Sequence, residues 1–318
     1  MFVYELTRVE PAFAAMPSGA AMTARVDCHH HFWRVARGDY DWLRADDHAI
    51  APLVRDFLPP NLIGTLKALG ITQTVLVQAA ATEAETDFLL ELAADHDFIA
   101  GVVGWVDLSK AESVATLERW AAQPKFKGVR PMLQDLPAND WIAREPHADV
   151  VQAMVRLGLR FDALVKPWHL EPLLRFVKRY PQLPVVIDHA AKPQLVQGWQ
   201  AHWAGTWRRH MASLAAQPQV SCKLSGLLGE APPSASHSVA EGVDALRPVW
   251  DLLLQWFGPE RLMWGSDWPV LTLVADYARW VSVCDSLIGE LAPAGQASVW
   301  HGSAQRFYGL APQAVAVA

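Results

Sequence analysis

The stretch VDCHHHFW (residues 26–33) decides how this chain is interpreted, because an apolar run ends there in three consecutive histidines. Successive side chains of a strand point to opposite faces, so Asp27, His29 and His31 are predicted to share one side and Cys28 and His30 the other. In a closed parallel barrel the first set would face inward at the carboxyl mouth, where such enzymes keep their chemistry. Two imidazoles at this spacing suit one divalent ion or a pair of acid–base groups. A histidine-rich surface loop is the alternative interpretation.

Eight short runs with the composition of β-strands recur along the chain, and each ends in polar or small residues. They cover Arg25–His29, Thr74–Ala79, Gly101–Val106, Phe126–Arg130, Arg160–Val165, Val185–His189, Gln219–Leu224 and Arg261–Ser266. Segments with helical spacing of apolar residues lie between most of them. Strands that alternate with helices favour parallel pairing through right-handed crossovers. Eight such units predict a (β/α)8 TIM barrel in the α/β class. A doubly wound open sheet is the alternative, but no glycine-rich fingerprint follows the first strand.

Two domain boundaries follow from this pattern. Residues 1–24 are predicted to be an N-terminal extension outside the fold, and residues 25–312 one barrel domain with a closing helix near Ala304–Leu310. The long loop after the first strand, residues 33–60, is rich in Trp, Tyr, Asp and Pro. Long loops in compact domains are usually functional, so we expect a lid over the barrel mouth.

Composition argues against two classes of partner, nucleic acid and anionic membranes. The chain has 318 residues and a net charge of −6, without the clustered Lys and Arg that nucleic acid or anionic membranes attract. No apolar stretch reaches the roughly 18 residues of a membrane span. Three widely spaced cysteines, an odd number, favour a reducing cytoplasm. These features are compatible with a monomer or a homo-oligomer.

Later strand ends deliver further polar side chains. The sixth, VVIDHAAKP, brings Asp188 and His189, and alternation predicts that His189 faces inward while Asp188 faces the other way. The eighth, RLMWGSDWP, ends in Asp267, and Gly265 leaves space inside the barrel near that carboxylate. The fifth places His169 just beyond its end.

An HxH on strand one, a His after a middle strand and an Asp after strand eight resemble the amidohydrolase superfamily. The motifs DCHHHFWRVARGDYDWL, VLVQAAAT, FKGVR, FDALVKPWHL, VVIDHAAKP, CKLSGL and WGSDWPV, in this order from about Val26 to Leu310, are similar to its sugar-lactone hydrolase branch. That branch includes L-fuconolactonase-like and L-rhamnonolactonase-like enzymes and is related to 2-pyrone-4,6-dicarboxylate hydrolase.

The resemblance implies a site formed by His29, His31, His189 and Asp267, with Asp267 as the general base that takes a proton from water. The same four residues are the predicted ligands of one divalent ion, and Zn2+ suits imidazole and carboxylate best. Some relatives work without a firmly held metal, so metal dependence stays open. No bridging carboxylate or carbamylated lysine ends strand four, and a two-metal site is not expected.

The predicted substrate-binding residues surround this core. Arg130 has a planar fork that matches a carboxylate or vicinal hydroxyls, with a surface ion pair as its alternative role. His169 is either a ligand or a substrate or packing group. The remaining candidates are Gln78, Lys223 and Ser225 as hydrogen-bonding groups and Trp33, Trp42 and Trp268 as apolar walls for a sugar ring. Lys192 is interpreted as solvated.

The predicted function is hydrolysis of a sugar (aldono-) lactone such as L-fuconolactone to the open acid, a step of carbohydrate catabolism. The His cluster, with or without a metal, would polarise the carbonyl or hold the water. One alternative is a hydrolase of a pyrone dicarboxylate or muconolactone, whose carboxylates should demand several arginines at the mouth. Others are a metal-dependent non-oxidative decarboxylase and a barrel retained only as a binding module.

Overall fold

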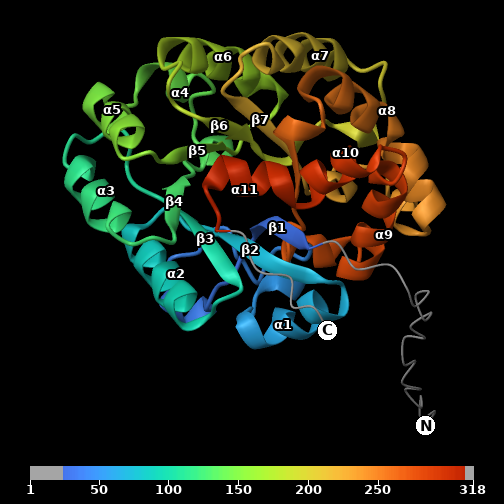
Figure 1. Ribbon diagram of the computed structural model, residues 1–318, viewed down its shortest axis with the longest axis horizontal. Coiled ribbons are helices and arrows are strands. Elements are labelled where there is room, and N and C mark those ends of the chain that lie inside the picture. The colour runs from blue at the N-terminus through green and yellow to red at the C-terminus, as the bar shows by residue number, and fades with distance from the viewer. Residues whose placement is uncertain (1–23, 312–318) are drawn as a thin grey trace.

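Eight parallel strands form the centre of the molecule. The computed structural model describes residues 24–311, and the predicted extension at 1–24 lies almost wholly outside them. The strands pair in chain order, each with the next (Figure 1). They are β1 Arg25–His30, β2 Ile71–Val77, β3 Ile99–Gly104, β4 Phe126–Val129, β5 Arg160–Ala163, β6 Val185–Ile187, β7 Val220–Leu224 and β8 Leu262–Trp264.

The sheet closes on itself between β1 and β8, beyond the end of β8. His30 and Trp268 form a parallel bridge there. The backbone N–H of Asp267 donates to the carbonyl of His29, and the N–H of His31 donates to that of Trp268, both at 2.7 Å. The predicted (β/α)8 TIM barrel is confirmed, and its seam lies beside the histidine run.

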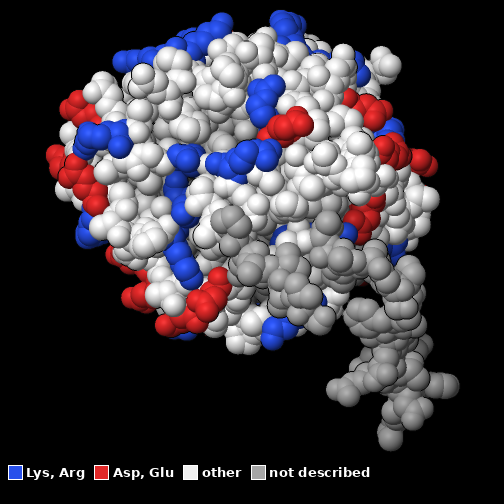
Figure 2. Space-filling view, viewed as in Figure 1, with Lys and Arg blue, Asp and Glu red and all other residues white. Residues whose placement is uncertain are grey.

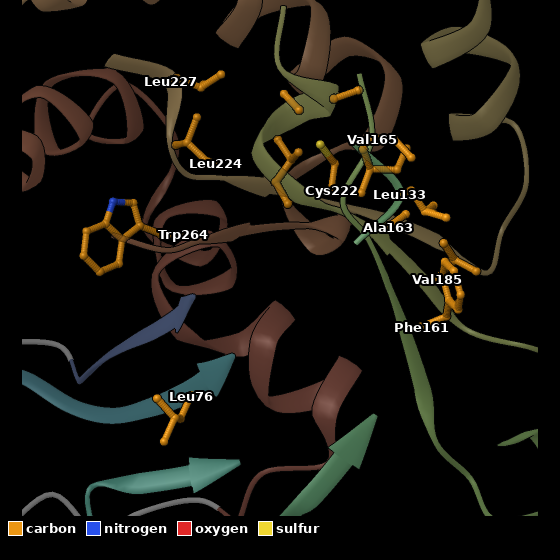
Figure 3. Close-up of a cluster of buried hydrophobic side chains, with 14 of the residues drawn as sticks. Leu76, Leu133, Phe161, Ala163, Val165, Val185, Cys222, Leu224, Leu227 and Trp264 are labelled. Atoms are coloured by element: carbon orange, nitrogen blue, oxygen red, sulfur yellow. The ribbon is translucent and has the colours of Figure 1, made fainter. Parts of the chain in front are cut away.

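Helices surround the barrel and bury the outer faces of its strands. Phe161, Ala163, Val185, Cys222 and Trp264 point outward into this layer (Figure 3). Burial of such apolar side chains contributes ~25 cal/mol per Å2 and is the main source of stability. The helices are α1 Pro59–Ala68, α2 Glu83–Asp95, α3 Ser113–Ala121, α4 Trp141–Arg144, α5 Ala148–Arg156, α6 Leu170–Arg179, α7 His202–Ala215, α8 Val239–Phe257, α9 Tyr277–Ile288, α10 Pro293–Ala297 and α11 Ser303–Tyr308.

A second apolar cluster fills the inside of the barrel. It is formed by inward residues of the strands together with Ala304, Tyr308 and Leu310 from α11 and the chain that follows it. In Figure 1 α11 lies across the barrel axis. The predicted closing helix is therefore present, and it seals the end of the barrel opposite the mouth.

One extra residue in β1 alters the predicted alternation. Asp27 pairs with Thr74 of β2 and His30 with Leu76, so three steps along β1 match two along β2, which defines a β-bulge. Cys28 belongs to the inner cluster together with Val26, so Asp27 between them faces the other side. The prediction that Asp27 shares the inner side was wrong.

Asp27 instead joins β1 to the region after β8. Its carboxylate accepts hydrogen bonds from the Ser266 backbone and hydroxyl and from the Tyr277 hydroxyl of α9, at 2.6–2.8 Å. His29 and His31 both face inward, as predicted, because the register shift between Asp27 and His30 turns the chain after Asp27.

The surface carries both signs of charge. In Figure 2 lysine and arginine side chains lie among uncharged ones, and Asp and Glu gather mostly toward the edges of the face shown. Within residues 24–311, no helix combines the length and apolar character that crossing a bilayer requires.

Candidate active site

A cavity of about 150 Å3 opens at the carboxyl mouth of the barrel. Its walls come from the loops after six different strands, as in other barrel enzymes. The residues that line it are His31, Trp42, Ala79, Arg130, Met132, Gln134, Asp135, Leu164, His189, Lys192, Asp267 and Val270.

One oxygen of Asp267 is the centre of the histidine cluster. Asp267 Oδ1 lies 3.3 Å from His31 Nε2, 3.7 Å from His29 Nε2 and 3.9 Å from His189 Nε2. All four side chains are buried or nearly so. The structure thus brings together the four residues that the sequence selected, from β1 and the residue that follows it and from the segments after β6 and β8.

Left-handed backbone places two of these four residues. Asp267 has φ 60°, and His189 has φ 51° at the start of a run of positive φ values that continues to Lys192. Such φ values are uncommon outside glycine and cluster at functional sites. The predicted alternation in β6 was therefore wrong: the strand ends at Ile187, Asp188 faces the inside, and His189 reaches the mouth through this irregular turn.

The hydrogen bonds of the rings leave Nε2 atoms directed at the cluster. His31 Nδ1 lies 2.8 Å from the carbonyl oxygen of Val77, which can only accept, so its proton is on Nδ1 and its Nε2 carries a lone pair. His189 Nδ1 bonds the Ser225 hydroxyl at 2.9 Å. Ser225 was predicted to bind substrate; here it orients His189.

This donor set fits one divalent metal ion. The lone pair of His31 Nε2 faces a carboxylate oxygen of Asp267, and neither atom carries a proton. Two such electron-rich atoms repel each other, and a cation between them stabilises the arrangement. The separations of 3.3–3.9 Å approach the ~3.3 Å edge of a tetrahedral site with ~2.0 Å bonds. Zinc prefers these ligand types.

A second grouping, His29 with Asp188 and His189, is a weaker candidate for the ion. Asp188 Oδ1 lies 3.0 Å from Lys223 Nζ and its Oδ2 lies 3.6 Å from Arg130 Nη1. Both cations would repel a metal ion placed there.

Burial and charge keep the three rings neutral and the carboxylate of Asp267 ionised. Burial lowers the pKa of His189 to about 4 and lowers those of His29 and His31, because a charged ring is poorly solvated there. Burial would raise the pKa of Asp267, but His189, His31 and His29 outweigh it and hold that pKa below its usual value. The carboxylate is therefore ionised beside neutral imidazoles.

Beneath His29 lies a fully buried charge network. Lys223 Nζ is 2.5 Å from Asp162 Oδ2 and 3.0 Å from both Asp188 Oδ1 and His29 Nδ1. Burial lowers the pKa of Lys223, but Asp162 and Asp188 raise it further, so the ammonium persists. Lys223 was predicted to touch substrate, but it lies under the site with no exposed surface and does not line the cavity.

Arg130 and Gln78 are coupled across β2 and the end of β4. The guanidinium of Arg130 donates to the carbonyl of Gln78, and the amide of Gln78 donates to the carbonyl of Arg130 at 2.6 Å. Arg130 lines the cavity, as expected of a substrate-binding residue. Gln78 is completely buried, and its position indicates that it holds Arg130.

The predicted aromatic walls separate into two groups. Trp42 lines the cavity and donates from its indole to the carbonyl of Ala79 at 2.8 Å. Trp33 and Trp268 instead pack on Phe57, with ring centroids 5.3 Å apart in both cases, and fasten the long loop to the barrel. Neither lines the cavity.

His169 lies apart from the cluster. Its Nδ1 accepts the backbone N–H of Lys166 at 3.0 Å and caps the short helical turn after β5. Burial lowers its pKa to about 4. Of the roles weighed for it, packing fits this position.

Lys192 is a cavity residue that the sequence interpretation placed in solvent. It lines the pocket, and its ammonium donates to Gln134 Oε1 at 2.8 Å. Burial lowers its pKa, although Asp267 and Glu230 oppose that effect. The sequence AAKP contains no glycine, so it did not predict the left-handed turn that directs Lys192 into the cavity.

Glu85 of α2 holds the turn after β2. Because Trp42 is bonded to Ala79 in that turn, Glu85 also supports the cavity wall that Trp42 forms. Its buried carboxylate accepts from the backbone N–H of Ala79 at 3.0 Å and of Ala80 at 2.7 Å. Burial raises the pKa of Glu85 to about 8, and the charge of Asp39 adds to the effect.

We expect this carboxyl to make stability fall as the pH rises. The folded pKa of Glu85 exceeds its ordinary value of 4.5, so its stabilising contribution is complete below about 4.5 and lost as the pH passes about 8. At ~1.4 kcal/mol per pKa unit the loss is at most ~5 kcal/mol. Melting temperatures between pH 5 and 9 should therefore depend less on pH in Glu85→Gln than in the wild type. The exposed Glu91→Gln on the same helix is the control, and an unchanged pH dependence in Glu85→Gln would assign the effect elsewhere.

An eight-stranded barrel with a His–Asp cluster at its mouth is an arrangement on which metal-dependent enzymes are built. A family model described as amidohydrolase matches residues 26–310, and the chain belongs to that family. The chain is 42% identical over 293 residues to the L-fucono-1,5-lactonase of Burkholderia ambifaria. This alignment covers 90% of this chain and 96% of that protein. It is 36% identical to the L-fucono-1,5-lactonase of Burkholderia multivorans, with coverage of 90% and 96%. The crystal structure of an amidohydrolase from Burkholderia multivorans with bound zinc superposes with a TM-score of 0.82, at 35% identity and coverage of 91% and 100%.

Proposed function

We propose that this protein hydrolyses a sugar lactone of the L-fuconolactone type to the open acid. The observation that carries the proposal is the convergence of three imidazoles on Asp267 Oδ1 in a cavity of sugar-ring size. The names of the two similar lactonases support the substrate class.

Asp267 is the proposed general base. Its carboxylate is ionised, faces the cavity and stands beside neutral rings, so it can take a proton from an attacking water and return it to the departing ring oxygen. A low pKa makes it a weak base, and the water must therefore be acidified by neighbouring positive charge. When bound, a divalent ion held by His29, His31, His189 and Asp267 supplies that charge and polarises the carbonyl.

Arg130 and Lys192 are the proposed binding groups for the rest of the substrate. The charge of Arg130 is balanced by Asp188 at 3.6 Å, and Lys192 is bonded to Gln134. Arg130, whose charge is already matched by Asp188, is the only arginine among the residues that line the cavity. These features favour a neutral polyhydroxylated lactone over a dicarboxylate. Trp42 offers an apolar wall for one face of the ring.

We place the reaction in the cytoplasm. All three cysteines are buried and unpaired in the structure, as in a chain that needs no oxidising compartment.

A pH-indicator assay on the purified protein tests the reaction. Acid should be released from L-fucono-1,5-lactone and related aldonolactones, and far less from pyrone dicarboxylate, because the latter would bring two carboxylates to a cavity whose only arginine, Arg130, is already paired with Asp188. Parallel reactions after chelation measure the contribution of the metal. Release of CO2 from an aromatic acid without acid from any lactone would replace this proposal with a decarboxylase.

A further inference from the structure

His29 lies between two cations and two carboxylates. Its Nδ1 is 3.0 Å from Lys223 Nζ and 3.4 Å from Asp188 Oδ1. Its Nε2 is 3.4 Å from Arg130 Nη1 and 3.7 Å from Asp267 Oδ1. A neutral imidazole has one N–H and one lone pair, so it cannot accept from both cations at once, nor donate to both carboxylates.

Two arrangements of the ring proton follow from these contacts. In the first, Nδ1 accepts from Lys223, and the proton on Nε2 points toward Asp267. In the second, the proton on Nδ1 points to Asp188, and Nε2 presents a lone pair to the cluster. Only the second arrangement offers Nε2 to a divalent cation, because metal-binding imidazole must be unprotonated at the binding nitrogen.

We propose that Lys223 and Asp188 are positioning residues of His29 with opposite effects, Lys223 favouring the proton on Nε2 and Asp188 the proton on Nδ1. Together they set how tightly the histidine cluster holds a divalent cation. The inference rests on the proposed assignment of His29 to the reactive cluster.

The surroundings of Lys223 hold its ammonium in place. Asp162 Oδ2 holds the ammonium of Lys223 at 2.5 Å, and the hydroxyl of Tyr308 from α11 donates to the same oxygen at 2.6 Å. Lys223, Asp162 and Asp188 have no exposed surface.

The carboxylate of Asp188 can accept a further hydrogen bond. Among the described residues no group donates a hydrogen bond to either of its oxygens, although cations lie near both. Buried acceptors are normally satisfied, so the exception calls for an explanation. The Nδ1 proton of His29, when it is there, supplies the missing donor.

Zinc affinity of the full chain, measured by competition with a chelator, tests the opposite effects. Asp188→Asn should weaken zinc binding about 10- to 100-fold, because the acceptor that supports the Nδ1 proton loses its charge. Lys223→Met combined with Asp162→Asn should tighten binding about tenfold, since it removes the donor that competes for Nδ1. The double change removes one buried charge of each sign, and an amide oxygen at position 162 still accepts the Tyr308 hydroxyl.

Lys127→Met is the matched control. Lys127 lies on β4 and donates to the carbonyl of Gly309 at the sealed end of the barrel, so its loss should leave zinc affinity unchanged. Weakening by both test variants would show a merely structural role and overturn the proposal.

Ring-nitrogen NMR of the wild type supplies a readout that needs no folded variant of Lys223, Asp162 or Asp188. The His29 signals, assigned by comparison with His29→Gln, should show a proton on Nε2 without metal and on Nδ1 with zinc. The same protonated nitrogen in both states, or no zinc binding by the wild type, would overturn the proposal. Lactone hydrolysis is assayed separately: opposite affinity changes in a chain that hydrolyses no lactone would reject the proposed reaction and keep this inference.

Discussion

Asp267→Asn is expected to lower kcat/KM for lactone hydrolysis about 10²- to 10⁴-fold, the range typical of losing a general base. The amide keeps the shape of the side chain but cannot take a proton from water. It also withdraws the negative charge on which the Nε2 atoms of His29, His31 and His189 converge at 3.3–3.9 Å. Steady-state rates on L-fucono-1,5-lactone, with matching melting curves to verify folding, measure the effect.

Asp135→Asn is the control for this change. Asp135 also lines the cavity but is exposed and makes no contact with the histidines among the described residues. Its substitution should alter kcat/KM only slightly. A folded Asp267→Asn enzyme with nearly wild-type kcat/KM would remove Asp267 from the mechanism.

Gly265→Ala is expected to destabilise the protein by about 1–3 kcal/mol and to reduce activity as well. A Cβ at this position would lie 2.8 Å from the Cβ of His29 and 3.0 Å from its backbone nitrogen. Backbone atoms cannot rotate out of the way, so the segment after β8 must move from β1. The shift would separate His29 from Asp267, whose N–H bonds the His29 carbonyl. Melting temperature and kcat/KM should fall together.

Gly64→Ala is the matched substitution without a steric consequence. Gly64 lies in α1 with nothing within 4 Å of an added Cβ. Alanine is favoured over glycine in a helix interior by about 0.5–1 kcal/mol, so stability should rise slightly and activity should not change. Equal stability of the Gly265→Ala protein and the wild type would show that the seam tolerates expansion.

The sequence was sufficient to predict the fold because each strand carried its own local signal. All eight predicted runs overlap observed strands, with ends that differ by a few residues. The seam beyond β8 was not predictable, since it depends on the single bridge between His30 and Trp268. Isolated bridges leave no periodic pattern in a sequence.

The site was predictable where residue type alone decides the chemistry and unpredictable where backbone geometry does. His29, His31, His189 and Asp267 do converge, and their functional roles stay predictions. The directions of Asp27 and Asp188 were wrong, because a bulge and an irregular turn break alternation. Lys223 looked like a strand-end polar residue, and only the three-dimensional packing shows it among buried carboxylates.

The seam also governs when a newly made chain can acquire its cluster. His29 is synthesised more than two hundred residues before Asp267, and their segments are neighbours across β1 and the residues after β8. A nascent polypeptide on the ribosome must therefore carry β1 without its closing partner until more than two hundred further residues have emerged. Truncated translation products that stop before residue 267 lack the central carboxylate, so the cluster exists only in chains that have been translated past that residue.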